Sequence, residues 1–205
     1  MRRLKVFSGI VFDLAKIKAV RSKGGLKVFE IRLNKNIKNS EKGMSIAVNG
    51  VCLTASLIKN AREFAADVTA ETMKKSTLSA LRTGSNVNVE FPVTPDGFLS
   101  GHIVQGHVDC TGRIESVDKK SGNIVIAVSY PEKFARYIIE KGSVAVDGIS
   151  LTAFDVNKDS FKVSVIPETF KATNVKFYNK GTKVNLEFDI ISKYVERQTN
   201  KRTEN

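Results

Sequence analysis

The chain has 205 residues, of which 41% are hydrophobic, and a formal net charge of +12 at pH 7. No stretch approaches the ~18 consecutive apolar residues of a membrane span, and the start lacks the apolar run of a secretory signal, so we expect a cytoplasmic protein without a membrane partner. The lysines are scattered, tryptophan is absent, and no basic stretch carries interleaved aromatic residues, so we expect no nucleic-acid partner despite the charge.

Internal repeats divide the chain into two similar halves. Three segments of the first half return in the same order in the second: Ser45–Thr54 at Ser143–Thr152, Val68–Thr72 at Val165–Thr169, and Gly84–Phe91 at Gly181–Phe188. This period is far longer than a solenoid unit of roughly 20–50 residues. The repeats predict two duplicated domains over residues 1–101 and 102–189, followed by a tail over residues 190–205 that serves oligomerisation.

Both halves show the period-two alternation of half-buried β-strands. The alternating apolar residues include Val87, Val89 and Phe91 in the first half, and Ile124, Ile126, Val128, Val144 and Val146 in the second. The dipeptides Asn49-Gly50 and Asp147-Gly148 are strong hairpin-turn signals. The sequence therefore predicts an all-β fold, with a barrel or a sandwich in each half.

Helical patterns are few. Pro131 followed by apolar residues at helical spacing predicts a helix over residues 131–141 that ends at Gly142. The equivalent stretch of the first half, residues 34–42, is more polar and predicts a shorter helix. Residues 190–198 carry an apolar stripe of Ile191, Tyr194 and Val195, and this stripe must pack either between subunits or back on its own barrel.

The two histidines of the chain, His102 and His107, lie at the junction of the two halves, in the Gly-containing segment of residues 100–109. A spacing of five residues makes them a poor metal pair, and Cys110 adds too few ligands for a zinc site. Two interpretations remain open: an ordinary linker with incidental histidines, or a proton carrier.

Cys52 and two Glu-Thr pairs are further candidates. Cys52 stands where the second half has Ser150, so it is either a small buried side chain or a thiol with a function. The pairs at Glu71 and Glu168 recur in both halves and serve either the turn or a polar ligand. The two cysteines are not placed as a disulfide framework, which is typical of a reducing compartment.

Several motifs together resemble riboflavin synthase of the alpha-chain type, which has two lumazine-binding domains. The motifs are Phe7-Ser8-Gly9-Ile10-Val11, Asn49-Gly50-Val51-Cys52-Leu53-Thr54, the histidine segment Ser100–Asp109, Asp147-Gly148-Ile149-Ser150-Leu151-Thr152 and Ile166-Pro167-Glu168-Thr169. The resemblance covers residues 6 to 197. The order of the motifs makes it specific, although each motif alone is weak.

The resemblance implies a fold, an assembly and a reaction. The fold is two tandem six-stranded Greek-key β-barrels with a C-terminal α-helix, and the assembly is a homotrimer. Two molecules of 6,7-dimethyl-8-ribityllumazine exchange a four-carbon unit, giving riboflavin and 5-amino-6-(D-ribitylamino)uracil, without a metal or a redox cofactor. The active site forms where the first barrel of one subunit faces the second barrel of its neighbour.

The resemblance also implies site residues. Acid–base work falls to His102, with Ser45, Cys52 and Thr152 as hydroxyl or thiol helpers. The substrate contacts of the first-barrel pocket are Phe7, Gly9, Ile10, Val11, Cys52, Leu53, Thr54, Asp67, Val68, Thr69, Ala70, Glu71 and Thr72. Those of the second-barrel pocket are Gly106, His107, Val108, Lys141, Ser150, Leu151, Thr152, Ile166, Pro167, Glu168, Thr169, Phe170 and Lys171. Two departures from the family are five extra residues before Phe7, since the family's chain starts almost at this Phe, and Ala70, where the family often has Lys.

Two other functions compete with the enzyme. Lumazine proteins of the same fold bind the chromophore as an optical antenna, but those relatives lose the histidine segment and much of one pocket. This chain keeps His102, His107, Cys52 and both Glu-Thr pairs, which favours the enzyme. A barrel that binds oligonucleotides would need aromatic stacking platforms, which the sequence does not offer.

Overall fold

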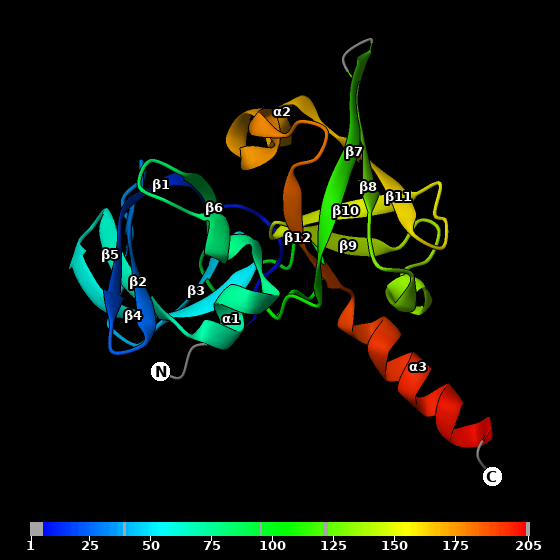
Figure 1. The fold of residues 1–205 in the computed structure, drawn as a ribbon, viewed down its shortest axis with the longest axis horizontal. Helices are drawn as coiled ribbons and strands as arrows, with labels where there is room; N and C mark the ends of the chain where they lie inside the picture. Colours follow the sequence, from blue (N-terminus) through cyan, green and yellow to red (C-terminus); the bar gives the residue numbers. More distant parts are fainter. Residues whose placement is uncertain (1–5, 39, 95, 121–122, 204–205) are drawn as a thin grey trace.

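The computed structural model describes residues 6–38, 40–94, 96–120 and 123–203. Two closed antiparallel barrels lie side by side, and a helix projects from the second (Figure 1). The first barrel runs in the order β1-β2-β5-β4-β3-β6. Its strands are β1 (Asp13–Lys23), β2 (Leu26–Arg32), β3 (Ser45–Val48), β4 (Val51–Asn60), β5 (Glu63–Val68) and β6 (Asn86–Glu90). Three hairpin-connected strands with β2 returning beside β5 form a Greek key.

The second barrel repeats this topology in the order β10-β11-β8-β7-β12-β9. Its strands are β7 (Cys110–Lys120), β8 (Asn123–Ser129), β9 (Ser143–Val146), β10 (Ile149–Phe154), β11 (Ser160–Val165) and β12 (Lys183–Phe188). The helical elements are α1 (Ala70–Lys75), η1 (Thr77–Ala80), η2 (Glu132–Tyr137), α2 (Pro167–Ala172), η3 (Asn174–Phe177) and α3 (Ile190–Thr203). The predicted all-β fold of two six-stranded barrels with a C-terminal helix is confirmed.

The apolar residues of the predicted alternation point inward and form a separate hydrophobic core in each barrel. Phe29, Phe64 and Val87 are fully buried in the first barrel, and Val144 and Phe161 in the second. Asn49 and Gly50 have φ values of +45° and +73°, and Asp147 and Gly148 repeat them at +45° and +78°. Positive φ at both central residues is the geometry of a type I′ turn, so the two dipeptides close the β3–β4 and β9–β10 hairpins as predicted.

Two predicted helices are wrong. Residues 131–141 contain only the 3₁₀ helix η2, and the chain is extended again at Ile138. Residues 34–42 show no helix in their described part, because the carboxylate of Asp13 accepts the backbone N–H of Asn34 at 2.6 Å and that of Lys35 at 3.0 Å. A side chain that satisfies the backbone in this way competes with helix formation.

The predicted tail helix is present as α3 (Figure 1). It is tied to its own barrel by ion pairs of Lys193 with Asp109 at 2.6 Å and of Glu196 with Arg136 at 3.0 Å. Its apolar stripe is not covered, since Ile191, Tyr194 and Val195 are 57–66% exposed. Within the described residues, no helix is both long enough and apolar enough to cross a membrane.

The two barrels are related by an approximate twofold axis. Phe7 and Val104, at equivalent positions of the repeat, form an antiparallel bridge in which each backbone N–H donates to the other's carbonyl, at 2.8 and 3.1 Å. Both are fully buried in a small cluster between the barrels with Ala47 and Ala145. The segment that leads into each barrel therefore lies in the interface.

A polar network continues this symmetry. Asn88 of β6 donates its side-chain N–H to the carbonyl of Asp147 at 3.0 Å, and Asn185 of β12 donates to the carbonyl of Asn49 at 2.8 Å. All four residues are buried. Buried polar groups of this kind are stabilising when each has a partner, so the network fixes the orientation of one barrel on the other.

The network is unequal at Asp147. Its carboxylate accepts the backbone N–H of Asn185 at 2.7 Å, the side-chain amide of Asn174 at 2.8 Å and the hydroxyl of Tyr178 at 2.8 Å. Burial nevertheless raises the pKa of Asp147 to about 6. Burial, together with the charge of Asp147, also raises the pKa of Tyr178 well above its usual range. The equivalent residue in the first barrel is the neutral Asn49.

Candidate active site

Equivalent strands of the two barrels present similar outward faces. On β4, the buried Val51, Leu53 and Ala55 point into the barrel, so Cys52, Thr54 and Ser56 point outward. On β10, the outward residues by the same alternation are Ser150, Thr152 and Phe154. The repeat therefore builds two similar faces, with Cys52 and Ser150 at the same position.

The outward face of the second barrel is hollowed into a cavity of about 440 Å³. Its lining residues are Lys141, Ser150, Leu151, Thr152, Phe154, Ser164, Ile166 and Thr169. All but Phe154 and Ser164 belong to the set predicted for this pocket. The sequence offered a signal for both, because Phe154 continues the alternation of Ser150 and Thr152, and Ser164 is the repeat position of the predicted Asp67.

Lys141 enters this cavity from a strained backbone. Its φ is +64°, in the left-handed region that disfavours residues with a Cβ, and the equivalent Gly43 of the first barrel has φ +89°. Both donate their backbone N–H to a strand carbonyl, Lys141 to that of Ala153 on β10 at 2.9 Å and Gly43 to that of Ala55 on β4 at 2.8 Å. Strain at one of two matched positions suggests that the lysine side chain is needed there.

The corresponding face of the first barrel carries an acid instead of a lysine. Asp67 of β5 is in register with Thr54 and accepts the hydroxyl of Ser56 at 2.8 Å. Thr69 caps α1 by accepting the N–H of Thr72 at 3.2 Å, and the two hydroxyls lie 3.0 Å apart. The two faces thus share a scaffold and differ in charge.

The recurrent Glu-Thr pairs begin short helices. Glu71 lies in the first turn of α1, and Glu168 in the first turn of α2, after Pro167 at the helix start. An acidic residue is stabilising there. A hydrogen bond from Lys75 at 2.7 Å lowers the pKa of Glu71. The recurrence of the pairs therefore has a structural explanation in each half.

His102 lies behind Ser150. Its Nδ1 is 2.7 Å from the Ser150 hydroxyl, and its Nε2 is buried with no hydrogen-bond partner in the described part of the chain. Burial lowers the pKa of His102 and the charge of Asp189 opposes this, so the imidazole is neutral near pH 7. His107 is exposed, and the structure brings it to no shared site with His102.

The segments before each barrel are exchanged relative to the predicted grouping. The carbonyl of Gly9 accepts the N–H of Ser150 in the second barrel at 2.8 Å, and that of Gly106 accepts the N–H of Cys52 in the first barrel at 2.8 Å. Val11 packs on the second core and Val108 on the first. Gly9–Val11 therefore belong with the second-barrel face and Gly106–Val108 with the first, opposite to the expectation.

Close approach explains the glycines at these two positions. A Cβ on Gly9 would lie 2.6 Å from the Cβ of Ser150, and one on Gly106 would lie 2.5 Å from the Cβ of Cys52. Their φ values of +76° and +78° also favour glycine. The backbone of Gly9, before the first barrel, therefore positions strand β10 of the second. The backbone of Gly106, before the second barrel, positions strand β4 of the first.

Two buried carboxylates hold these segments, and the sequence analysis missed both. Glu90 accepts the N–H of Ser8 at 2.7 Å and of Gly9 at 3.1 Å. Glu187 accepts the N–H of Gln105 at 2.7 Å and of Gly106 at 2.9 Å. Burial raises the pKa of Glu90, and that of Glu187 to about 6. The sequence carried a signal for both, since the repeat places a glutamate near the end of the equivalent strand in each half, β6 and β12.

The remaining predicted residues occupy varied places. Ser45 is buried on β3, in register with Thr54, and Phe7 is fully buried between the barrels. Ile10 and Ile166 are exposed. The described residues contain no group of three or more His, Cys, Asp or Glu side chains placed to hold a metal ion. Cys52 and Cys110 form no disulfide.

Comparisons with known proteins place the chain among similar sequences. The lumazine binding domain family matches residues 8–92 and again residues 105–189. Riboflavin synthase of Actinobacillus pleuropneumoniae is 41% identical over 94% of this chain and 89% of its own length. The enzyme of Mycobacterium tuberculosis is 42% identical over 94% and 97%, and that of Bacillus subtilis 36% over 98% and 93%.

Solved structures show the same fold at lower identity. LumP complexed with riboflavin superposes with a TM-score of 0.80 at 22% identity, covering 89% of this chain and 98% of that one. LumP complexed with 6,7-dimethyl-8-(1'-D-ribityl) lumazine gives a TM-score of 0.79 at 20% identity, with the same coverage.

Proposed function

Because this chain belongs to the riboflavin synthase family, we propose that each of its barrels holds one molecule of 6,7-dimethyl-8-ribityllumazine on its outward face. The protein is a riboflavin synthase, a transferase that converts two of these molecules to riboflavin and 5-amino-6-(D-ribitylamino)uracil. The observation that carries the proposal is the duplication of one pocket scaffold with unequal side chains.

The unequal side chains suit two copies of one substrate in different roles. Cys52, Asp67 and Gly43 of the first barrel correspond to Ser150, Ser164 and Lys141 of the second. One lumazine donates four carbons and the other accepts them, so identical pockets would treat them alike. The acid on one face and the lysine on the other give the two bound rings different electrostatic surroundings.

His102 and Ser150 form the proton-handling pair of this proposal. The neutral imidazole contacts the Ser150 hydroxyl, which lines the second-barrel cavity. His102 therefore acts through Ser150, by taking up the proton that leaves the acidic methyl group of a bound lumazine. Cys52, Ser45 and Thr152 act as thiol and hydroxyl helpers. Much of the rate comes from holding two substrates in register.

The assembly that fits this proposal is a homotrimer. Facing pockets need the first barrel of one subunit beside the second barrel of another, because the two outward faces of one chain lie on separate barrels. The exposed stripe of Ile191, Tyr194 and Val195 on α3 supports burial between subunits. We place the enzyme in the cytoplasm, without a nucleic-acid or membrane partner and without a metal or redox cofactor.

The test is incubation of the purified protein with 6,7-dimethyl-8-ribityllumazine alone. Riboflavin should appear by its absorbance, at one molecule for every two lumazines consumed, and without an added cofactor. A His102→Ala variant, which lacks the imidazole, is the matched control. Tight binding of lumazine by the wild-type protein without conversion would instead support an antenna protein.

A further inference from the structure

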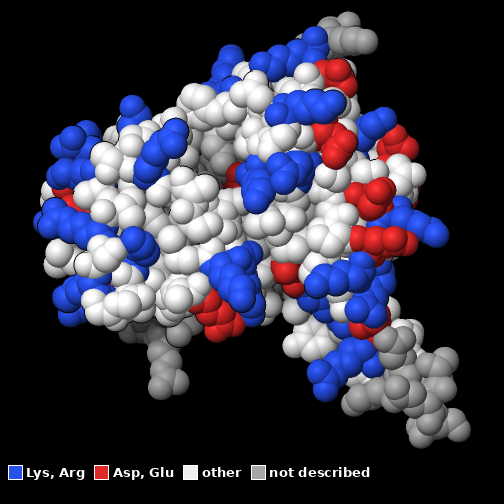
Figure 2. Space-filling model, in the orientation of Figure 1, with Lys and Arg blue, Asp and Glu red and all other residues white. Residues whose placement is uncertain are grey.

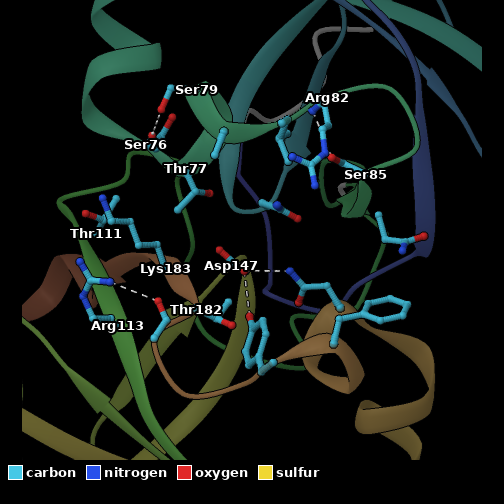
Figure 3. Close-up of a pocket in the computed structure, with 18 of the residues that line it drawn as sticks. Ser76, Thr77, Ser79, Arg82, Ser85, Thr111, Arg113, Asp147, Thr182 and Lys183 are labelled. Carbon is cyan, nitrogen blue, oxygen red and sulfur yellow. Dashed lines mark hydrogen bonds between the residues drawn. The ribbon is translucent and has the colours of Figure 1, made fainter.

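A second cavity, of about 810 Å³, opens between the two barrels. Figure 2 shows the hollow between the barrels, with Lys and Arg atoms on its rim. None of the residues predicted for the active site lines it. Its walls come from the segments just before β6 and β12 and from η1 and η3, and its floor includes the buried Asp147 (Figure 3). A cavity of this size fits a small organic molecule.

Four cations line this cavity: Lys74, Arg82, Arg113 and Lys183. None of them forms an ion pair with a carboxylate in the part of the chain that the structure describes. The carboxylate among the lining residues is Asp147, which already accepts three hydrogen bonds. Four cations against one carboxylate leave the cavity with an excess of positive charge.

Two of these cations are placed against each other. Arg113 of β7 and Lys183 of β12 are directly opposite in the antiparallel register. Like charges directly opposite each other destabilise a sheet, whereas a pair of opposite charges stabilises it. Here the Arg113 guanidinium donates to the Gly181 carbonyl at 3.2 Å, which neutralises neither charge. An anion bound between the two side chains would relieve the repulsion.

Donors and one aromatic ring complete the site. Figure 3 shows Arg82 on one side of the cavity and Arg113 and Lys183 on the other, with Ser79, Ser85 and Thr182 among the lining side chains. The ring of Phe177 also lines the cavity and is 48% exposed. Guanidinium and hydroxyl groups bind phosphate oxygens, and an exposed ring stacks on a flat heterocycle.

We propose that this cavity binds a small organic phosphate, an aromatic ring system that carries one or more phosphate groups. The phosphates lie between Arg82, Arg113 and Lys183, and the ring lies against Phe177. Because Arg82 belongs to the first barrel and the other two cations to the second, such a ligand bridges the barrels. Its binding should therefore raise the thermal stability of the protein.

The test is calorimetric titration of the protein with ATP and, separately, with pyrophosphate, in metal-free buffer at 100 mM KCl. The test variant is Arg113→Gln with Lys183→Gln. The matched control is Lys23→Gln with Lys158→Gln, which removes the same charge from two exposed positions outside the cavity. Lumazine turnover of both double variants should equal that of the wild type and reports that they fold.

Both probes should bind the wild-type protein, with ATP the tighter, at a Kd below about 1 mM. The test variant should weaken both by at least about tenfold, since two charge-assisted contacts are lost, and the control by less than about twofold. Phe177→Ala should weaken ATP and leave pyrophosphate unchanged. No measurable binding by the wild type, or an equal loss in test and control variants, would overturn the proposal.

Discussion

Replacing Gly148 with alanine should weaken the packing of the two barrels, because this glycine lies on the approximate twofold axis. A Cβ there would lie 2.7 Å from the backbone nitrogen and 2.8 Å from the Cα of Gly50, and a Cβ on Gly50 would lie 2.6 and 2.9 Å from the same atoms of Gly148. Backbone atoms in a type I′ turn cannot rotate away as a side chain would. The two hairpins would have to move apart, and with them the hydrogen bonds of Asn88 and Asn185.

Two contributions make up the expected loss in the free energy of unfolding. A Cβ at φ +78° costs about 1 kcal/mol in backbone strain. Overpacking at a rigid contact adds about 2 kcal/mol. The total of about 3 kcal/mol corresponds to a fall in Tm of roughly 6–12 °C for a chain of this length.

The control isolates the contact from the strain. Gly181 has φ +89°, but a Cβ there meets nothing within 4 Å. Gly181→Ala should therefore lose only about 1 kcal/mol. Urea unfolding of both variants at pH 7 measures the difference, and equal losses would refute the role assigned to the Gly50–Gly148 contact.

Four further outcomes are expected. The folded-state pKa of Asp147, about 6, lies above the unfolded value near 3.9, so its contribution to stability is present below pH 4 and is lost as the pH rises through 6. Urea unfolding from pH 4 to 7 should show that Asp147→Asn removes about 2 kcal/mol of this dependence, and parallel curves would contradict it. Lys141→Gly should gain about 1 kcal/mol by releasing a positive φ while lumazine binds more weakly, as urea unfolding and fluorescence titration would report. Deleting residues 190–205 should lower the assembly state in sedimentation and abolish turnover together, so a fully active truncated monomer would exclude the trimer interface. His102→Ala or Cys52→Ser should lower turnover by about ten- to ten-thousand-fold while lumazine still binds, and wild-type turnover in both would remove them from the mechanism.

The repeat made most of the fold predictable. Alternation and the Asn49-Gly50 and Asp147-Gly148 turns depend on local chemistry, and both appear in the structure as expected. The helix predicted at residues 34–42 failed because the carboxylate of Asp13, distant in sequence, holds that backbone. Local patterns do not report such tertiary hydrogen bonds.

The sequence predicted many of the residues that line the candidate site, but not which barrel each leading segment contacts. Ser150 and Thr152 were predicted from a contiguous motif that recurs in both halves, whereas Lys141 came from the family resemblance alone, since the first half has Gly43 at its position. The exchange of Gly9 and Gly106 between barrels was missed, because each motif was assigned to the half that contains it. Only the three-dimensional contact shows which barrel a leading segment serves.

That exchange has a consequence for the time at which the protein completes its structure. The carbonyl of Gly9 cannot form its hydrogen bond until Ser150, which is 141 residues later in the chain, has been synthesised. At roughly 5–20 residues per second, a ribosome takes about 7–28 seconds to make that interval. During it, the carbonyl of Gly9 lacks its β10 partner, although Glu90 and Val104 are made earlier and can already hold the N–H groups of Phe7, Ser8 and Gly9. The contact of Cys52 with Gly106 is complete in sequence 44 residues before Ser150 is made, so the two pocket strands are ordered in turn and the strand of the second barrel is ordered last.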